Sequence, residues 1–245
     1  MRELSGGKPV GIKLCVGYPH ELMAIIKAML ETGMLLDFIV IDGAEGGTGS
    51  APIELSDRVG MPLREGLILA RNALVGAGLK PRIKIAASGK VYSGASIAMN
   101  AALGADWCNA ARSFMFALGC VQSLRCHTDH CPTGVATQSM ARQRGWVVPE
   151  KAERVARFQK STLSALHDIV VACGLKTVDD FTPEALRQRI SPMEMRAMSD
   201  VYHFAEAGEL IDGATDFHLA NWWDMADPNT FAARAVSRTT FVSQA

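Results

Sequence analysis

The apolar residues of this chain follow two kinds of pattern along its first 111 positions. Short continuous apolar runs predict strands that are buried on both faces, at residues 8–17, 36–43, 82–88 and 106–111. Between these runs, apolar residues recur at three- and four-residue spacing, which predicts helices at residues 20–35, 62–79 and 96–105. Strands and helices therefore alternate along this part of the chain.

The alternation predicts an α/β fold with four βα units and a parallel sheet. A closed TIM (β/α)8 barrel contains eight such units and is typically about 250 residues long. Four units make half of a barrel. We therefore expect either an open sheet or the last four βα units of a barrel whose first half is elsewhere.

A different organisation follows the fourth unit. Residues 113–138 form a cysteine-containing loop, and residues 150–175 have the period of one long amphipathic helix that stops near Gly174. We expect residues 1–175 to hold the βα units, this loop and the long helix, and residues 176–245 to form a C-terminal helical extension.

The extension carries one helix-start signature, in which Thr182 precedes Pro183 and Glu184. Residues 222–231, WWDMADPNTF, have no clear period and are expected to be irregular.

Composition narrows the classes of partner. The 245 residues are 49% apolar and carry 25 basic and 25 acidic side chains, so no net field favours nucleic acid or an anionic membrane. The opening segment MRELSGGKPV lacks the apolar stretch of a secretory signal, and no window is apolar enough to span a bilayer. We therefore predict a cytoplasmic protein that acts on a small molecule.

Three of the six cysteines lie close together in GCVQSLRCHTDHCP, where Cys120, Cys126 and Cys131 are separated by five and then four residues. Six cysteines are too few for a disulfide scaffold, and this clustering indicates metal or redox chemistry. Three thiolates followed by proline suit an iron–sulfur cluster. Two alternatives stay open: a Cys3His zinc site completed by His127 or His130, and small buried cysteines without a ligand.

Three further features lie at predicted strand ends, where parallel α/β proteins bind ligands. The loop DGAEGGTGSAP, residues 42–52, has four glycines and one ionisable group inside it, Glu45. The turns at residues 87–90 and 109–112 carry Lys90 and Arg112, which suit a phosphate site. Ordinary turns with solvated side chains are the alternative for all three.

Lys13 lies inside an otherwise apolar run, where an unpaired ammonium would be costly to bury. It is therefore expected to face a ligand or to form a structural salt bridge.

The order of these segments resembles the FMN-binding synthase domain of glutamate synthase. The resemblance runs through DGAEGGTGSAP, KIAASGKVYSG and AALGADWCNAARSFMFALGC to CHTDHCPTGVATQ, about residues 8–138, and its cysteine ending is highly specific. It implies a (β/α)8 barrel that binds FMN beside a [3Fe-4S] cluster and reductively converts 2-oxoglutarate and ammonia to glutamate. Electrons would pass through the cluster to FMN, which would reduce the imine formed from 2-oxoglutarate.

The resemblance also implies roles for individual residues. Lys13 would lie near the flavin and the substrate carboxylates, and Lys13 and Glu45 would be the catalytic pair. The remaining implied contacts are Gly46, Gly47, Thr48 and Gly49 with the substrate, Ser88, Gly89, Lys90, Ala110, Ala111 and Arg112 with the FMN phosphate, and Cys120, Cys126 and Cys131 with the cluster.

The chain also departs from the family pattern. Its two phosphate turns have fewer glycines than is usual, and this makes it more similar to the shorter, stand-alone members. It has no N-terminal nucleophilic cysteine, so we expect it to use free ammonia or a glutaminase partner. The electron donor would be ferredoxin or an NADPH-dependent subunit. We expect the first half of the barrel to come from another chain or a second protomer, or the 245 residues to be a fragment of a longer protein. The alternative function is a truncated or non-catalytic module stabilised by zinc or an iron–sulfur cluster.

Overall fold

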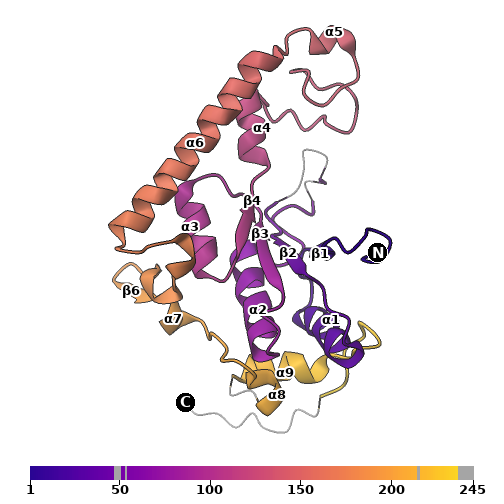
Figure 1. The fold of residues 1–245 in the computed structure, drawn as a ribbon, viewed down its shortest axis with the longest axis vertical. Coiled ribbons are helices and arrows are strands. Elements are labelled where there is room, and N and C mark those ends of the chain that lie inside the picture. The colour runs from indigo at the N-terminus through magenta and orange to yellow at the C-terminus, as the bar shows by residue number, and fades with distance from the viewer. Residues whose placement is uncertain (47–50, 53, 214–215, 237–245) are drawn as a thin grey trace.

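The computed structural model describes residues 1–46, 51–52, 54–213 and 216–236. Its centre is a parallel sheet of four strands in the order β1-β2-β3-β4, as the alternating pattern predicted (Figure 1). The strands are β1 (Gly11–Leu14), β2 (Phe38–Asp42), β3 (Lys84–Ser88) and β4 (Trp107–Asn109), and the helices between them are α1 (Pro19–Thr32), α2 (Leu63–Gly76) and α3 (Gly94–Ala102).

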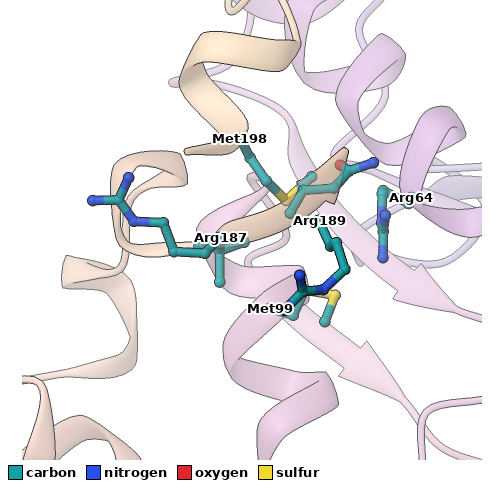
Figure 2. Close-up of a pocket in the computed structure, with 7 residues that line it drawn as sticks. Arg64, Met99, Arg187, Arg189 and Met198 are labelled. Atoms are coloured by element: carbon teal, nitrogen blue, oxygen red, sulfur yellow. The ribbon is translucent and has the colours of Figure 1, made fainter. Parts of the chain in front are cut away.

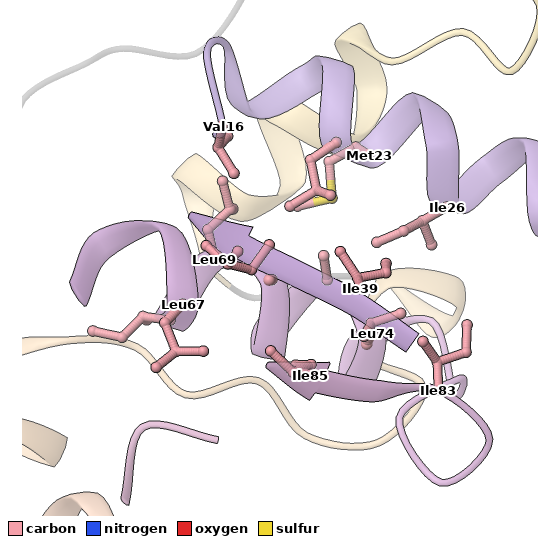
Figure 3. Close-up of a cluster of buried hydrophobic side chains, with 14 of the residues drawn as sticks. Val16, Met23, Ile26, Ile39, Leu67, Leu69, Leu74, Ile83 and Ile85 are labelled. Atoms are coloured by element: carbon pink, nitrogen blue, oxygen red, sulfur yellow. The ribbon is translucent and has the colours of Figure 1, made fainter. Parts of the chain in front are cut away.

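One face of this sheet packs against the helices and forms the main core (Figure 3). Ile39 and Ile41 of β2 and Ile85 of β3 are at most 1% exposed and lie among side chains of α1 and α2. Burying each side chain of this size contributes about 1.5–3 kcal/mol. The helices are therefore held to the sheet mainly by apolar contacts.

The other face of the sheet, here called the second face, carries the residues that alternate with those of the core. None of them belongs to the main core. The rings of Phe38 and Trp107 meet edge to face there with centroids 5.8 Å apart, and a side chain at Gly11 would collide with the Phe38 ring. Trp107 is 40% exposed, so this face keeps large apolar groups open to solvent.

The amino-terminal edge of the sheet is held by ion pairs. Asp106 accepts hydrogen bonds from Lys80 Nζ and Lys84 Nζ, both over 2.8 Å, and from the Ile85 N–H over 2.7 Å. Arg2 and Asp37 form a second pair at 2.7 Å. These contacts fix the start of the strands, at the edge opposite the loops that were predicted to bind ligands.

Three helices lie between β4 and the C-terminal region. The first, α4 (Arg112–Leu118), was not expected; it ends at Gly119, whose positive φ of 102° closes the helix. The long helix α6 (Val148–Ala172) confirms the predicted helix at residues 150–175, and Gly174 follows it with a φ of 70°. A short helix, α5 (Met140–Gln143), lies between them.

The C-terminal region differs from the expectation of a helical extension. It contains an antiparallel hairpin, β5 (Arg187–Ser191) and β6 (Glu194–Ala197), and the signature at Thr182 starts only a single 3-10 turn, η2 (Pro183–Ala185). The other elements are η1 (Val178–Asp180), α7 (Met198–Val201), α8 (Glu209–Asp212) and α9 (Phe217–Met225).

The expectation of an irregular segment at residues 222–231 is wrong for its first part, because α9 extends to Met225. This helix is capped by Asp216, whose side chain accepts from the Leu219 N–H over 2.8 Å.

The C-terminal region packs on the same core as the sheet. Met198, Leu210 and Leu219 belong to the main core, and α9 lies beside α1 (Figure 1). Polar contacts lock this packing. Asn72 of α2, 5% exposed, donates through Nδ2 to the His203 carbonyl oxygen over 2.7 Å and accepts through Oδ1 from the Ala205 N–H over 3.0 Å.

No helix within the described ranges is long and apolar enough to cross a bilayer.

Candidate functional site

The carboxyl ends of the strands bring several predicted residues to one edge of the sheet. Asp42, Ser88 and Asn109 occupy one row of the register across β2, β3 and β4, and all three lie on the second face. Lys13 lies on the same face, one strand away. Its Nζ forms an ion pair with Asp42 Oδ2 at 3.0 Å, with the lysine side chain 58% exposed. Lys13 was expected either to face a ligand or to form a structural salt bridge, and the structure shows the salt bridge.

Glu45 has a structural contact that sequence reasoning missed. Both carboxylate oxygens accept from the Leu63 N–H, over 3.0 and 2.9 Å, at the first residue of α2. The residue at the N-cap position is Pro62, which supplies no side-chain cap. The Glu45 carboxylate, 18 positions before Leu63, caps the helix instead. The negative charge also suits the positive end of the helix dipole. A proline at an N-cap was the only signal in the sequence.

The glycines beside Glu45 allow close backbone packing. Gly43 N donates to the Ser88 carbonyl oxygen over 2.7 Å, and a Cβ at Gly46 would lie 3.0 Å from the Gly43 carbonyl oxygen. These two glycines therefore let the loop after β2 fold against the end of β3. The other predicted loop residues, Gly47, Thr48 and Gly49, lie outside the described residues.

The turn after β3 is tight and carries an exposed cation. Gly89 has a φ of 135°, and a Cβ there would lie 3.2 Å from the Gly43 nitrogen. Lys90 has a φ of 45°, and its Nζ pairs with Asp57 Oδ1 at 2.9 Å. Both side chains of this pair are more than half exposed, so the ion pair is weak.

The turn after β4 runs beside the turn after β3. Ala110 packs against the main core, Ala111 is the N-cap of α4, and Arg112 is its first residue. The two turns are tied together by Ser113, whose buried Oγ donates to the Val91 carbonyl oxygen over 3.1 Å. The structure thus brings the predicted phosphate residues of both turns to one place.

The three clustered cysteines share the loop between α4 and α5, at the far end of the molecule from β6 and α8 (Figure 1). Cys131 is buried; burial raises the pKa of its thiol, but the Thr133 hydroxyl and backbone N–H groups of residues 133, 135 and 136 lower it to about 7. Cys120 Sγ accepts from the Gln122 N–H over 3.4 Å.

The loop does not assemble a metal site in this conformation. Across residues 1–46, 51–52, 54–213 and 216–236, no three His, Cys, Asp or Glu side chains come together in a geometry that could hold a metal ion. This applies equally to a zinc site with His127 or His130. His130 Nδ1 lies 3.2 Å from an Arg142 guanidinium nitrogen instead.

Cys15 is a further polar group near the strand ends that the sequence did not single out. It follows β1, and its thiol lies 3.8 Å from the Met61 carbonyl oxygen. Burial raises the pKa of this thiol, so it is held in the protonated form. It lines a cavity of about 270 Å³ together with Leu14, Tyr18 and Phe231.

Comparison with known proteins identifies the family of this chain. The model described as "Conserved region in glutamate synthase" matches residues 1–176. The chain belongs to this family. The glutamate synthase large subunit-like protein YerD of Bacillus subtilis is 43% identical over 179 residues, covering 73% of this chain and 34% of the relative. The archaeal glutamate synthase [NADPH] of Methanocaldococcus jannaschii is 32% identical over 172 residues, covering 70% and 33%.

The expected kinship with the stand-alone glutamate synthase-like proteins is thus confirmed. The chain spans about a third of the length of these two relatives. Among solved structures, a flavocytochrome b2 variant with sulfite bound covers 100% of this chain and 46% of its own, at 15% identity and a TM-score of 0.48. A likeness this weak carries no argument about function.

Proposed function

We propose that this chain is part of a glutamate synthase-type oxidoreductase that converts 2-oxoglutarate to glutamate by reductive amination. The observation that carries the proposal is the family match over residues 1–176 together with Lys13, Asp42, Ser88 and Asn109 at one edge of one sheet face. In this proposal residues 1–175 are the C-terminal half of a (β/α)8 barrel, and residues 176–245 are an extension packed outside it.

The residues of the second face support the proposal that further strands complete the barrel. It carries Phe38 and the 40% exposed Trp107, and its Lys13 and Asp42 face away from the main core. In a closed barrel such a face points inward and is filled by side chains of the other strands. The other half would come from a further segment, a partner chain or a second protomer, and would cover these groups.

The turns after β3 and β4 have the chemistry that an FMN phosphate requires. Ser88, Gly89 and Lys90 would approach it from one side and Ala110, Ala111 and Arg112 from the other. Lys90 would exchange Asp57 for the phosphate at little cost, because exposed ion pairs contribute about 0–1 kcal/mol. Bound FMN would supply hydride transfer to the substrate carbon.

The neighbouring residues would bind and orient the dicarboxylate substrate. Lys13 would leave its ion pair with Asp42 and pair instead with a carboxylate of 2-oxoglutarate, whose charge it would neutralise. Glu45 and the loop of Gly46, Gly47, Thr48 and Gly49 would close over the substrate. Nitrogen would come from ammonia or a glutaminase partner, and electrons from ferredoxin or an NADPH-dependent subunit.

Cys120, Cys126 and Cys131 would hold the [3Fe-4S] cluster. Their donor chemistry fits, because thiolates are the ligands of such clusters and the N–H groups around Cys131 and Cys120 stabilise thiolate sulfur. The described loop conformation does not gather them, so cluster binding requires the loop to rearrange.

Metal and flavin analysis tests the proposal. The full chain, co-expressed with the N-terminal half of its relative YerD and prepared anaerobically, should contain iron and FMN. Cys126→Ser should lose the iron, while Cys173→Ser, which changes an exposed thiol after α6, should retain it. A preparation free of both iron and FMN would contradict the proposal, and equal iron loss in the two variants would contradict the cluster ligands.

One observation favours the alternative of a non-catalytic module. Glu45, the proposed catalytic carboxylate, is already engaged as the cap of α2. Under this alternative the preparation would contain no FMN, and it would hold zinc or an iron–sulfur cluster; a zinc-bound preparation would be colourless. The same metal and flavin analysis therefore separates the two functions.

A further inference from the structure

A cavity of about 200 Å³ lies between α2, α3 and the C-terminal hairpin (Figure 2). Arg64 of α2 and Met99 of α3 form one side. The other side comes from the start of β5, residues 186–189, and from Met198. Residues 186–198 lie outside the stretch matched by the family model, so this cavity, here called the arginine cavity, depends on the C-terminal region of this chain.

The charge of the arginine cavity is one-sided. Arg64, Arg187 and Arg189 line it, and none of the lining residues is acidic. Within the part of the chain that the structure describes, the side chains of Arg64 and Arg187 have neither a hydrogen bond nor an ion pair. The side chain of Glu184, which precedes β5, interacts with Arg71. Three guanidinium groups without an acidic partner lower the free energy of a bound anion.

Only one of the three guanidinium groups is held by hydrogen bonds within the described parts of the fold. Arg189 donates through one Nη to the Pro192 carbonyl oxygen over 3.1 Å and through the other to Met195 Sδ over 3.7 Å, which fixes it against the hairpin. In Figure 2 the side chains of Arg64 and Arg189 lie close to Met99, and Arg187 points away from both. Arg64 and Arg189 are therefore the two groups placed to share one ligand, with Arg187 at the rim.

The other residues that line the cavity are apolar, except for Gln188. Leu186, Met99 and Met198 supply thioether and aliphatic surface, and Leu186 packs against both hydrophobic clusters of the protein. Gln188 adds an amide whose Oε1 is buried without a hydrogen-bond partner among the described residues. Buried polar atoms are almost always paired. The Gln188 oxygen is an acceptor, so it would pair with a donor such as water and not with an anion.

We propose that the arginine cavity binds a small aliphatic carboxylate. The carboxylate would lie between Arg64 and Arg189, since a guanidinium donates two parallel hydrogen bonds to a carboxylate. The aliphatic part would lie against Met99, Met198 and Leu186. Drug-sized ligands occupy pockets of about 300–1,000 Å³, so a cavity of about 200 Å³ takes a smaller molecule. This site goes beyond the proposed reaction and does not depend on it.

Binding of unbranched carboxylates to the full chain tests this site. Calorimetric titration with acetate, butyrate and hexanoate should give affinities that rise about fourfold for each methylene that enters the cavity. Hexanamide, which has the same shape without the charge, should bind at least about tenfold more weakly than hexanoate. With ε-methyl-labelled methionine, hexanoate should shift the signals of Met99 and Met198 and leave unchanged that of Met34, which follows α1, is 73% exposed and does not line the cavity.

Variants identify the cations. Arg64→Gln and Arg189→Gln should each weaken hexanoate binding about tenfold, and Arg64→Lys, which keeps the charge without the two-pronged donor, should weaken it less. The matched control Arg82→Gln changes an exposed arginine outside the cavity and should bind normally. A urea midpoint equal to wild type confirms that each variant is folded.

Three results would overturn the proposal. Affinities independent of chain length, or inorganic phosphate binding as tightly as hexanoate, would indicate nonspecific attraction of anions. Equal binding of hexanamide would indicate an apolar cavity only. Equal weakening in Arg82→Gln and Arg64→Gln would place the interaction elsewhere on the surface. Loss of FMN or iron does not affect this test, so it is independent of the proposed enzyme activity.

Discussion

Replacing Asn72 by Ala should loosen the packing of the C-terminal region on α2. One amide, 5% exposed, pairs with two backbone groups more than 130 positions away, the His203 carbonyl and the Ala205 N–H. Alanine can pair with neither. Both groups lie where the chain passes from α7 towards α8, so their loss acts directly on the attachment of that segment.

The size of the effect follows from the number of partners lost. A buried backbone group without its hydrogen-bond partner costs about 1–3 kcal/mol, and two are lost here. Water that enters the space left by the shorter side chain offsets part of this cost. We therefore expect the free energy of unfolding to fall by about 2–4 kcal/mol, a large share of the roughly 5–15 kcal/mol typical of a folded domain.

Urea unfolding followed by circular dichroism measures this loss, and hydrogen exchange locates it. Exchange should accelerate most in residues 203–212. The matched control is Asn229→Ala, because Asn229 is exposed and its side chain interacts with Asp227 in the same turn, not with a distant segment; it should change stability by less than about 0.5 kcal/mol. An Asn72→Ala midpoint equal to that of Asn229→Ala would refute the reasoning.

Three further variants probe other parts of the molecule. Asp106→Asn should lower the free energy of unfolding by about 1–2 kcal/mol at neutral pH. Burial raises the pKa of the Asp106 carboxyl, but two lysines and a backbone N–H lower it by more. The stability that the ionised carboxylate contributes is therefore lost as pH falls below about 4. Urea titrations across pH 3–8 should show that loss in wild type and not in the variant. Glu45→Ala should cost about 1 kcal/mol by removing the α2 cap, whereas Glu31→Ala, at an exposed helical site, should not; equal urea midpoints would contradict the cap. Leu74→Ala, at a fully buried site, should cost about 2–5 kcal/mol, far more than Leu163→Ala at a 51% exposed one; similar losses in thermal unfolding would argue against the core assignment.

The sheet and its helices could be predicted because each element repeats one simple pattern. The run FIVID of β2 is short, rich in β-branched residues and followed by a glycine-rich loop, which favours a buried strand, and the small residues of α3 fit a helix packed on a sheet. The ends were less certain: the predicted strand at residues 8–17 is only Gly11–Leu14 in the structure. On either side of it, Val10 bonds to Asp37 and Val16 to Met61, outside the regular ladder, which periodicity cannot reveal.

The hairpin of β5 and β6 could not be predicted for a different reason. Its sequence RQRIS is mostly charged or polar, and both strands are largely exposed, so no apolar alternation marks them. The helix α9 was not predicted, although Asp216 is a residue type that commonly caps helices. Its last four residues are the start of WWDMADPNTF, a segment without a clear period. Weak local signals of this kind are decided by packing against α1 and α2.

The site residues show a further limit of sequence reasoning. The sequence predicted Lys90 in the turn after a strand, and Lys13 inside a strand facing a ligand or forming a salt bridge. The partners that they have in the structure, Asp42 and Asp57, are set by β2 and the loop after it. Glu45 likewise meets the start of α2 only because that loop folds back. Contacts between segments 18 to 33 positions apart have no periodic signature.

These pairings have a consequence for ligand binding at the strand ends. In the described structure Lys13 and Lys90 each have a carboxylate partner, and the Glu45 carboxylate accepts from the α2 N-terminus. Binding of an anionic cofactor or substrate there must therefore proceed by exchange of partners. Both lysine side chains are more than half exposed, so their ion pairs are screened and contribute at most about 1 kcal/mol. A phosphate or carboxylate that accepts several hydrogen bonds can displace them, whereas the helix cap at Glu45, which is part-buried and adjoins the core, resists exchange.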